Sequence, residues 1–460
     1  MQAQRERTRT ETAGGPPPPS HERAALRAFR RAALTSRGYR AFLESRGVDH
    51  RAVTRLAEVP YTDKRAVFAD AVEPWLDGGR VADAAELVTS SGQTGVFSVG
   101  VTSRSERRAQ ERAIDSAVAA LGGSERSSTL LLNCLPMGIA IPTRLATVAT
   151  PSVHLEMAVE VLLRLAPDFD RTVVAAEPLF LKELGETALR RRGPGFAERV
   201  AACYVGGEWV AESWRRYVSG LFGFDAPGDA RPGILVSMGA AEVGVHALVE
   251  TPALRVARGE LGDPSARREL FGRDPGYAPT LLAWDPNRYH AEERWHPDGA
   301  RTLVLTALTR RLLPLVRYDL DDEAEIVDPA AANRALGLAG TSAALAAPAV
   351  ALWGRRGTTV SGEGWSLRPE TVKEGLFAIA AHAAALTGRF RIAAAGGRPE
   401  LHVQLREGVR PAPRLAESLG ALLAATAGAA GAVHVHGYRD YPFHEAGDFQ
   451  HKPRYLEPVA

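Results

Sequence analysis

The segment Val200-Ala201-Ala202-Cys203-Tyr204-Val205-Gly206-Gly207-Glu208 is an apolar run that ends in two glycines and an acid. A short apolar run bounded by turn residues is typical of a buried strand. Three similar runs lie at residues 130–132, 173–176 and 234–236, and helix-like stretches separate them. Apolar strands that alternate with helices predict an α/β fold, in which mainly parallel sheets are covered by helices.

The length of 460 residues suits two or three domains. Residues 1–20 are rich in arginine and proline and lack an apolar core, so we expect a disordered tail rather than a targeting signal. Residues 21–353 carry the apolar strands and predict a large N-terminal domain. The shorter pattern of residues 354–460 predicts a small C-terminal α+β domain. Its expected strands are 390–393, 400–405 and 432–436, and its expected helices begin at Pro369 and span 414–427.

The charges nearly balance, since 56 basic and 54 acidic residues leave a net charge of +2. This argues against a protein that coats nucleic acid, because neutralising phosphates requires a basic surplus. The most apolar stretch, residues 128–150, is interrupted by Pro136, Pro142 and Arg144, so we expect no membrane span. Two cysteines allow neither a disulfide framework nor a cysteine-rich zinc site. The cytoplasm is therefore the expected compartment.

Lysine is scarce, because only four of the 56 basic residues are lysine: Lys64, Lys182, Lys373 and Lys452. A lysine is a compact point charge on a flexible stem, and the planar fork of arginine does not replace it. A lysine inside a chemically important segment is therefore a candidate for a specific role.

Two glycine-rich turns follow expected strands. In Thr89-Ser90-Ser91-Gly92-Gln93-Thr94-Gly95, glycines let the backbone approach a ligand, and hydroxyl and N–H groups can surround phosphate oxygens. The alternative is a plain hairpin turn. Gly206-Gly207-Glu208 follows a strand at the position where α/β proteins bind ligands, although a tight strand-to-helix turn would explain it equally well.

Two acidic segments also follow expected strands. In Met238-Gly239-Ala240-Ala241-Glu242, the carboxylate either holds Mg²⁺ or is an ordinary loop residue. Strands are expected at 302–305 and 312–318, with an acidic turn after the second that ends in Asp321-Asp322-Glu323. This turn is either solvated or accepts hydrogen bonds from a ribose.

Taken in order, these segments resemble the adenylate-forming superfamily, and most closely its phenylacetate–CoA ligase-like branch. The lead-in Val59-Pro60-Tyr61-Thr62-Asp63-Lys64 and the run Pro314-Leu315-Val316-Arg317-Tyr318 belong to the same likeness. So do Gly354-Arg355, with Gly364 and Pro369 at the family's spacings, and a C-terminal segment that contains Lys452. The resemblance implies a large nucleotide-binding domain and a small domain that rotates about a hinge between half-reactions.

The resemblance also implies a role for each matched position. Lys452 would be the catalytic lysine that bridges the substrate carboxylate and the α-phosphate, and Glu242 would ligate Mg²⁺. The implied ATP and AMP contacts are Ser90, Ser91, Gly92, Thr94, Gly95, Gly207, Glu208, Met238, Gly239, Asp322 and Arg355. An acid pocket is expected between the strand-end loops, with Met137, Gly138, Val205 and Met238 as its lining.

This chain departs from the family pattern at four positions. Val96 stands where the phosphate loop usually has lysine, Met238 replaces the adenine-stacking aromatic, and Ala241 replaces threonine. The hinge position usually filled by Asp or Lys falls at Gly357 or Thr358.

These features leave three functions open. The first is an acid–CoA ligase that uses ATP, Mg²⁺ and CoA on an aryl or medium-sized carboxylic acid. The second is the same adenylation with an amine, hydroxyl or protein-thiol acceptor, and the third is a non-catalytic nucleotide-binding relative. The expected assembly is a monomer or a homodimer, without nucleic acid or membrane as a partner.

Overall fold

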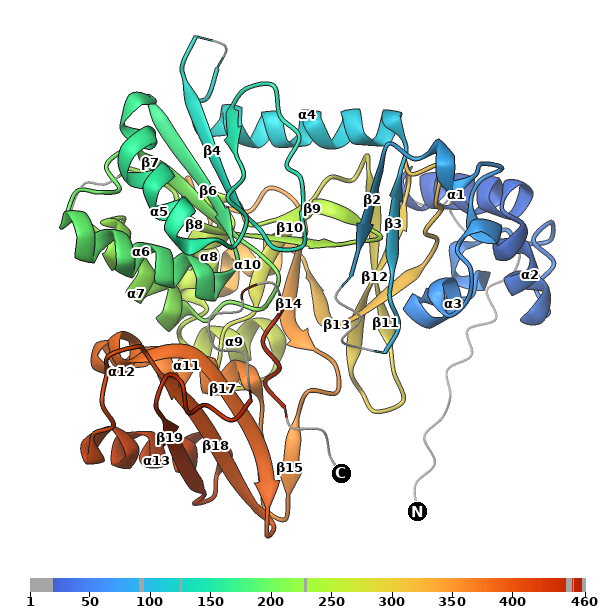
Figure 1. The fold of residues 1–460 in the computed structure, drawn as a ribbon. Coiled ribbons are helices and arrows are strands. Elements are labelled where there is room, and N and C mark those ends of the chain that lie inside the picture. The colour runs from blue at the N-terminus through green and yellow to red at the C-terminus, as the bar shows by residue number, and fades with distance from the viewer. Residues whose placement is uncertain are drawn as a thin grey trace.

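The computed structural model describes residues 20–90, 95–124, 126–226, 230–443, 449 and 451–456. The tail expected at residues 1–20 lies outside them, except for Ser20, the first residue of α1. Figure 1 shows a large helix-covered sheet and, below it, the orange-to-red C-terminal elements. This arrangement confirms the predicted α/β class with a smaller C-terminal domain.

The large sheet has twelve strands, in the order β11-β12-β13-β14-β10-β9-β8-β7-β6-β4-β5, with β1 paired to β13. Its parallel part consists of β4 (Thr129–Cys134), β5 (Thr147–Ala149), β6 (Arg171–Ala176), β7 (Val200–Val205) and β8 (Gly233–Ala240). The antiparallel part consists of β9 (Gly244–Val249), β10 (Thr280–Trp284), β11 (Tyr289–Trp295), β12 (Arg301–Ala307), β13 (Tyr318–Val327) and β14 (Ala349–Arg355). Every residue of β4 is buried, as expected for a parallel strand that is covered on both faces.

Helices and short elements surround this sheet. The N-terminal part contains α1 (Ser20–Thr35), α2 (Arg37–Ser45), η1 (Leu56–Glu58), β1 (Thr62–Asp63), α3 (Lys64–Phe68), η2 (Glu73–Trp75), η3 (Val81–Asp83), β2 (Glu86–Thr89) and β3 (Val99–Thr102). The helices that follow are α4 (Arg104–Ala120), α5 (Leu155–Glu160), η4 (Val161–Leu165), η5 (Ala166–Asp168), α6 (Pro178–Arg192), α7 (Glu212–Phe222), α8 (Pro252–Glu260), α9 (Pro264–Phe271) and α10 (Pro329–Ala335). Ser103 and Glu106 form a capping box that begins α4, as the local sequence alone allows.

The predicted strand at 312–318 is wrong, because the strand in this region is β13, Tyr318–Val327. The acidic residues expected in a turn therefore lie inside a strand between β12 and β14. Charged side chains can occupy a central strand when each has a partner. The partners are arginines, in the pairs Arg294–Asp319, Arg355–Asp322, Arg368–Glu323 and Arg301–Glu325.

The C-terminal elements form separate small sheets. They are β15 (Val360–Gly362), β16 (Trp365–Leu367), α11 (Pro369–Ala378), α12 (Ala380–Ala385), β17 (Leu386–Ala395), β18 (Arg398–Leu405), α13 (Pro413–Ala427) and β19 (Ala432–His436). The strands and helices predicted in this region are confirmed. β17, β18 and β19 form one three-stranded sheet, and α13 packs against it.

Polar contacts join these elements to the large sheet's helices. The Glu374 carboxylate accepts hydrogen bonds from the backbone N–H groups of Glu212 (2.9 Å) and Ser213 (2.8 Å), so α11 caps the start of α7. Lys182 on α6 donates to the Leu386 carbonyl at 2.8 Å and pairs with Glu186 at 2.9 Å. One of the four lysines thus has a structural role between the two parts.

Within the described residues, no helix combines the length and the apolar character needed to cross a membrane.

Candidate active site

The carboxyl ends of the central parallel strands meet at one edge of the sheet. The register places Cys134, Ala176, Val205 and Val236 side by side across β4, β6, β7 and β8. The loops that follow β4, β6 and β7 carry Met137 and Gly138, Glu177, and Gly207 and Glu208, whereas Met238 and Gly239 lie in β8 itself, just beyond Val236. Sequence-predicted pocket and nucleotide positions therefore share one edge, which is where α/β sheets bind ligands.

The predicted pocket residues differ in exposure. Val205 is fully buried in the hydrophobic core, so it supports the edge from within the sheet. Met137 is 37% exposed and has a left-handed backbone with φ of 59°. Met238 is half-buried and packs against the core.

The turn after β7 requires its two glycines. A Cβ on Gly206 would lie 2.5 Å from the Ser237 carbonyl oxygen, and a Cβ on Gly207 would lie 2.9 Å from Glu177 Oε1. Gly207 also has φ of +100°, which side chains rarely tolerate. The Gly-Gly pair thus lets this loop approach both neighbouring strand ends.

Glu242 lies in a buried polar pocket beside the β2–β3 hairpin. Its Oε2 accepts a hydrogen bond from the Ser98 hydroxyl at 2.7 Å, and its Oε1 accepts one from the Tyr318 hydroxyl at 2.8 Å. Its backbone carbonyl accepts a hydrogen bond from Arg310. A Cβ on Gly100 would lie 1.8 Å from the Ala241 carbonyl oxygen, so the hairpin packs directly on this turn.

These groups fit Mg²⁺. A buried carboxylate with hydroxyl neighbours supplies the hard oxygen donors that this ion prefers, and phosphate oxygens and water commonly complete its shell. The sequence analysis named Glu242, gave Tyr318 no role beyond its place in the family-like run, and missed Ser98, which directly precedes β3.

The base of the expected phosphate loop is closed by two serines. Ser90 N–H donates to the Ser98 carbonyl at 3.0 Å, and the Ser90 hydroxyl accepts from Ser98 N–H at 2.9 Å. Gly95, on the far side of the loop, has φ of +81°. The predicted contacts Ser91, Gly92 and Thr94 lie outside the described residues.

Lys64 lies at the base of this loop. Its Nζ donates to the Ser90 hydroxyl at 3.2 Å. Burial lowers the pKa of Lys64, the nearby Glu242 carboxylate raises it, and Arg355 and Lys452 lower it further. The parallel pairing of β1 with β13, Thr62 opposite Tyr318, brings this lysine to the site. The sequence analysis placed Lys64 only in the lead-in, and its one further signal was the scarcity of lysine.

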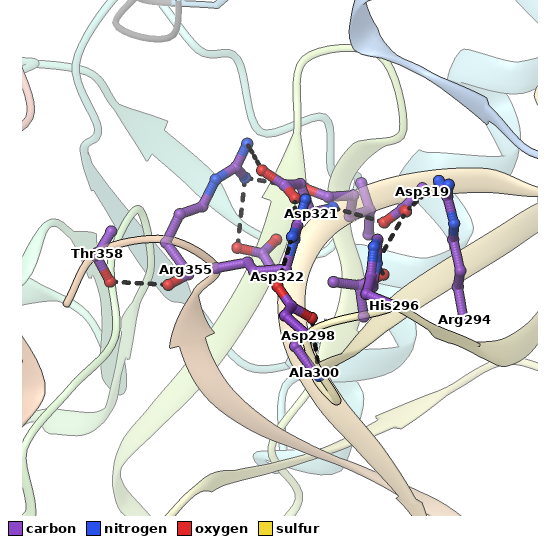
Figure 2. A network of polar contacts seen from close by, with 12 residues as sticks. Arg294, His296, Asp298, Ala300, Asp319, Asp321, Asp322, Arg355 and Thr358 are labelled. Carbon is purple, nitrogen blue, oxygen red and sulfur yellow. Dashed lines mark hydrogen bonds and ion pairs between the residues drawn. The ribbon is translucent and has the colours of Figure 1, made fainter. Parts of the chain in front are cut away.

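Asp322 and Arg355 face each other across β13 and β14. Figure 2 shows their side chains pointing toward one another, with Arg355 Nη1 3.4 Å from Asp322 Oδ1 and 2.9 Å from the Leu320 carbonyl. Burial raises the pKa of Asp322, while Arg355 and Lys452 lower it. The Thr358 hydroxyl donates to the Arg355 carbonyl at 2.8 Å, which shapes the turn where the chain leaves the large sheet.

A second group of charges lies beyond β6 and β7. The Glu208 carboxylate accepts hydrogen bonds from Lys373 on α11 and from the Tyr455 hydroxyl, the latter at 2.6 Å. Glu177, the first residue after β6, is 6% exposed. Burial, reinforced by the Glu208 charge, raises the pKa of Glu177 to about 7, although Lys452, Arg389 and Lys373 oppose this. The sequence analysis missed Glu177 and Tyr455, and named Lys373 only as one of the four lysines.

Lys452 lies near both charge groups. Its positive charge lowers the pKa values of Glu177 and Asp322. The segment that carries it is held by a bridge between Ile392 and Leu456, in which Ile392 N–H donates to the Tyr455 carbonyl at 2.8 Å. The C-terminal segment therefore brings one scarce lysine close to Glu177, Asp322 and Lys64.

No protein-family model and no curated protein matches this chain. Among solved structures, 2-hydroxyisobutyryl-CoA ligase in the postadenylation state, in complex with 2-HIB-AMP, is similar with a TM-score of 0.68 and 14% identity over 97% of this chain and 94% of that chain. An open conformation of the same ligase, in complex with 2-HIB-AMP and CoA, gives a TM-score of 0.55 at 14% identity, over 98% of this chain and 97% of that chain. Anthranilate CoA ligase in complex with anthranoyl-AMP gives a TM-score of 0.50 at 12% identity, over 81% of this chain and 67% of that chain. The chain therefore has the fold of the adenylate-forming CoA ligases.

Proposed function

We propose that this protein is an ATP-dependent ligase that adenylates a carboxylic acid and then transfers the acyl group to CoA. The observation that carries the proposal is the mutual proximity of charged groups, in a fold used by adenylate-forming CoA ligases: Lys64 is influenced by Glu242, Arg355 and Lys452, and Asp322 by Arg355 and Lys452. These residues come from five separate segments, and the family resemblance implies a role for four of them: Lys452, Glu242, Asp322 and Arg355.

The first half-reaction brings two anions together. A carboxylate oxygen of the acid bonds to the α-phosphorus of ATP, the bond from that phosphorus to the bridging oxygen breaks, and pyrophosphate leaves. Positive charge is needed where negative charge develops, and pre-positioned groups provide it most effectively. Lys452 would supply that charge at the reacting carboxylate, and Lys64 would supply it at the loop where Val96 replaces the usual lysine.

The remaining residues would hold the nucleotide. The Asp322 carboxylate would accept hydrogen bonds from the ribose hydroxyls, and Arg355 would orient that carboxylate and favour its ionised form against the effect of burial. Glu242, fixed by Ser98 and Tyr318, would hold Mg²⁺, which when bound neutralises phosphate charge. We propose that Met137, Gly138 and Met238 line the pocket for an aryl or medium-sized acid, with Val205, which is buried in the core, supporting them from beneath.

The second candidate function is the same adenylation with an amine, hydroxyl or protein-thiol acceptor. It is favoured by the turn at the proposed hinge, where Gly357 has φ of +76° and Thr358 bonds back to Arg355. Neither residue carries the charge usual at this hinge, so the motion that admits CoA would differ. For both candidate functions we also propose a domain boundary at residue 354 and a rotation of the small domain between the half-reactions.

The test is acid-dependent exchange between ATP and pyrophosphate over a panel of aryl, hydroxylated and medium-sized acids, with and without CoA. Exchange followed by thioester formation supports the first function. Exchange without a thioester supports the second, and no exchange with any acid contradicts both. Lys452→Ala should reduce exchange at least a hundredfold and leave ATP binding largely intact. Arg454→Ala, an exposed cation two residues away, is the matched control and should leave exchange unchanged.

A further inference from the structure

Three histidines and one glutamate lie together on one face of the small C-terminal sheet. Strand neighbours alternate between faces, so Glu400 and His402 on β18 share a face, as do His434 and His436 on β19. The parallel register places His402 opposite His434. The other face of β18 carries Leu401, Val403 and Leu405, which are fully buried in the core beside α13.

The distances from Glu400 to His402 and His434 suit a shared ion better than direct hydrogen bonds. Glu400 Oε2 lies 3.7 Å from His402 Nε2, and Glu400 Oε1 lies 3.8 Å from His434 Nε2. These separations are too long for hydrogen bonds. Two ligands of a tetrahedral Zn²⁺ with bonds of about 2.05 Å are about 3.4 Å apart. One ligand atom from each of the three residues lies within 4.8 Å of the others, and the His402 and His434 rings stack with centroids 4.4 Å apart, so a shared ion would draw the three side chains together.

His436 supports the orientation of His402. His402 Nδ1 and His436 Nε2 are 3.0 Å apart and share a hydrogen bond. When His402 donates from Nδ1, its Nε2 lone pair is free toward Glu400. A histidine that binds a metal through one nitrogen commonly donates a hydrogen bond from the other, which fixes the ring.

We propose that Glu400, His402 and His434 form a binding site for a divalent transition-metal ion, with Zn²⁺ as the representative ion and His436 as the positioning residue. Two imidazole nitrogens and one carboxylate are a typical zinc donor set, and nitrogen ligands disfavour Mg²⁺. The His434 side chain is 43% exposed, so a water molecule can complete the coordination. This site is separate in residues and in preferred ion from the carboxylate site at Glu242.

The ion would fasten an edge strand. β19 has five residues and pairs with β18 along one side of the three-stranded sheet. Its chain continues into the segment that carries Lys452. A metal that bridges His434 to Glu400 and His402 would therefore cross-link the last strand before that segment, and would stabilise the folded chain by binding it in preference to the unfolded chain.

The test uses the full-length protein, with any polyhistidine tag removed and metals stripped, titrated with ZnCl₂ by calorimetry. We expect one Zn²⁺ per chain, a raised melting temperature on binding, and no displacement by a tenfold excess of Mg²⁺. His434→Gln and Glu400→Gln should each weaken Zn²⁺ binding at least tenfold. His154→Gln, an exposed histidine of the large domain, is the matched control and should bind as the wild type does.

Bound Co²⁺ should give the intense visible absorption of a tetrahedral site, and His434→Gln should lose it. Thermal unfolding of the metal-free variants, monitored by circular dichroism, checks that they fold. Because the His434 side chain is exposed, His434→Gln should disturb folding less than Glu400→Gln. The proposal is overturned if the wild type binds no Zn²⁺ at 100-fold excess, or if both folded variants bind it as tightly as the wild type. None of these results depends on whether the chain adenylates an acid.

Discussion

Replacing Glu177 by glutamine should make the protein more stable at neutral pH and leave its stability unchanged in acid. Burial raises the pKa of this carboxyl from its ordinary value of 4.5 to about 7. Below pH 4.5 the group is protonated in both the folded and the unfolded chain, so ionisation costs nothing. Between pH 4.5 and 7 the unfolded chain loses this proton while the folded chain keeps it, so stability falls as pH rises.

The size of this effect follows from the shift. Each unit of pKa corresponds to about 1.36 kcal/mol, so a rise from 4.5 to about 7 costs about 3 kcal/mol above pH 7. Glutamine has no proton to lose and avoids this cost. At roughly 2 cal/mol/K of unfolding entropy per residue, a chain of this length gains about 3 °C in melting temperature.

The assay is thermal unfolding of the wild type and Glu177→Gln at half-unit steps from pH 4.5 to 8.5. The difference in melting temperature should grow between pH 4.5 and 7 and then level off. Glu363→Gln, an exposed glutamate in a turn, is the control and should show no such growth. The reasoning is refuted if the Glu177→Gln difference is the same at pH 5 and pH 8, or if the wild type is the more stable protein at pH 8.

Two further predictions concern the phosphate loop and the glycine turn. Lys64→Ala should raise the KM for ATP at least tenfold in the exchange assay, because it removes the cation beside Ser90. Lys64→Arg should restore ATP binding only in part. An unchanged KM in the alanine variant would show that Lys64 does not contribute to nucleotide binding. Gly207→Ala should destabilise the protein by about 1–3 kcal/mol, because its Cβ would lie 2.9 Å from Glu177 Oε1 on a backbone with φ of +100°. Urea unfolding measures this loss of stability. The control is Gly396→Ala, at an exposed glycine with φ of +55° and no neighbour within 4 Å, which isolates the contribution of backbone conformation.

The local sequence determined much of the architecture. The C-terminal strands and helices appear where hydrophobic periodicity and Pro369 predicted them, because those signals act within a few residues of the chain. The order of the motifs likewise predicts the fold of adenylate-forming ligases without reference to any long-range contact. Glu242, Asp322 and Lys452 were all named from these motifs.

Only the tertiary structure decided what surrounds those residues. The strand predicted at 312–318 is wrong, because arginines from distant strands pair with the acidic side chains of β13 and make a central strand possible. Strand pairing between β1 and β13 brings Lys64 to Ser90, and the register of β18 with β19 brings His402 to His434. Burial in the folded molecule, reinforced by the Glu208 charge, raises the pKa of Glu177. These features depend on contacts between residues that are tens to hundreds of positions apart in the chain. Secondary-structure propensity and motif spacing are local properties, so they carry no information about such contacts.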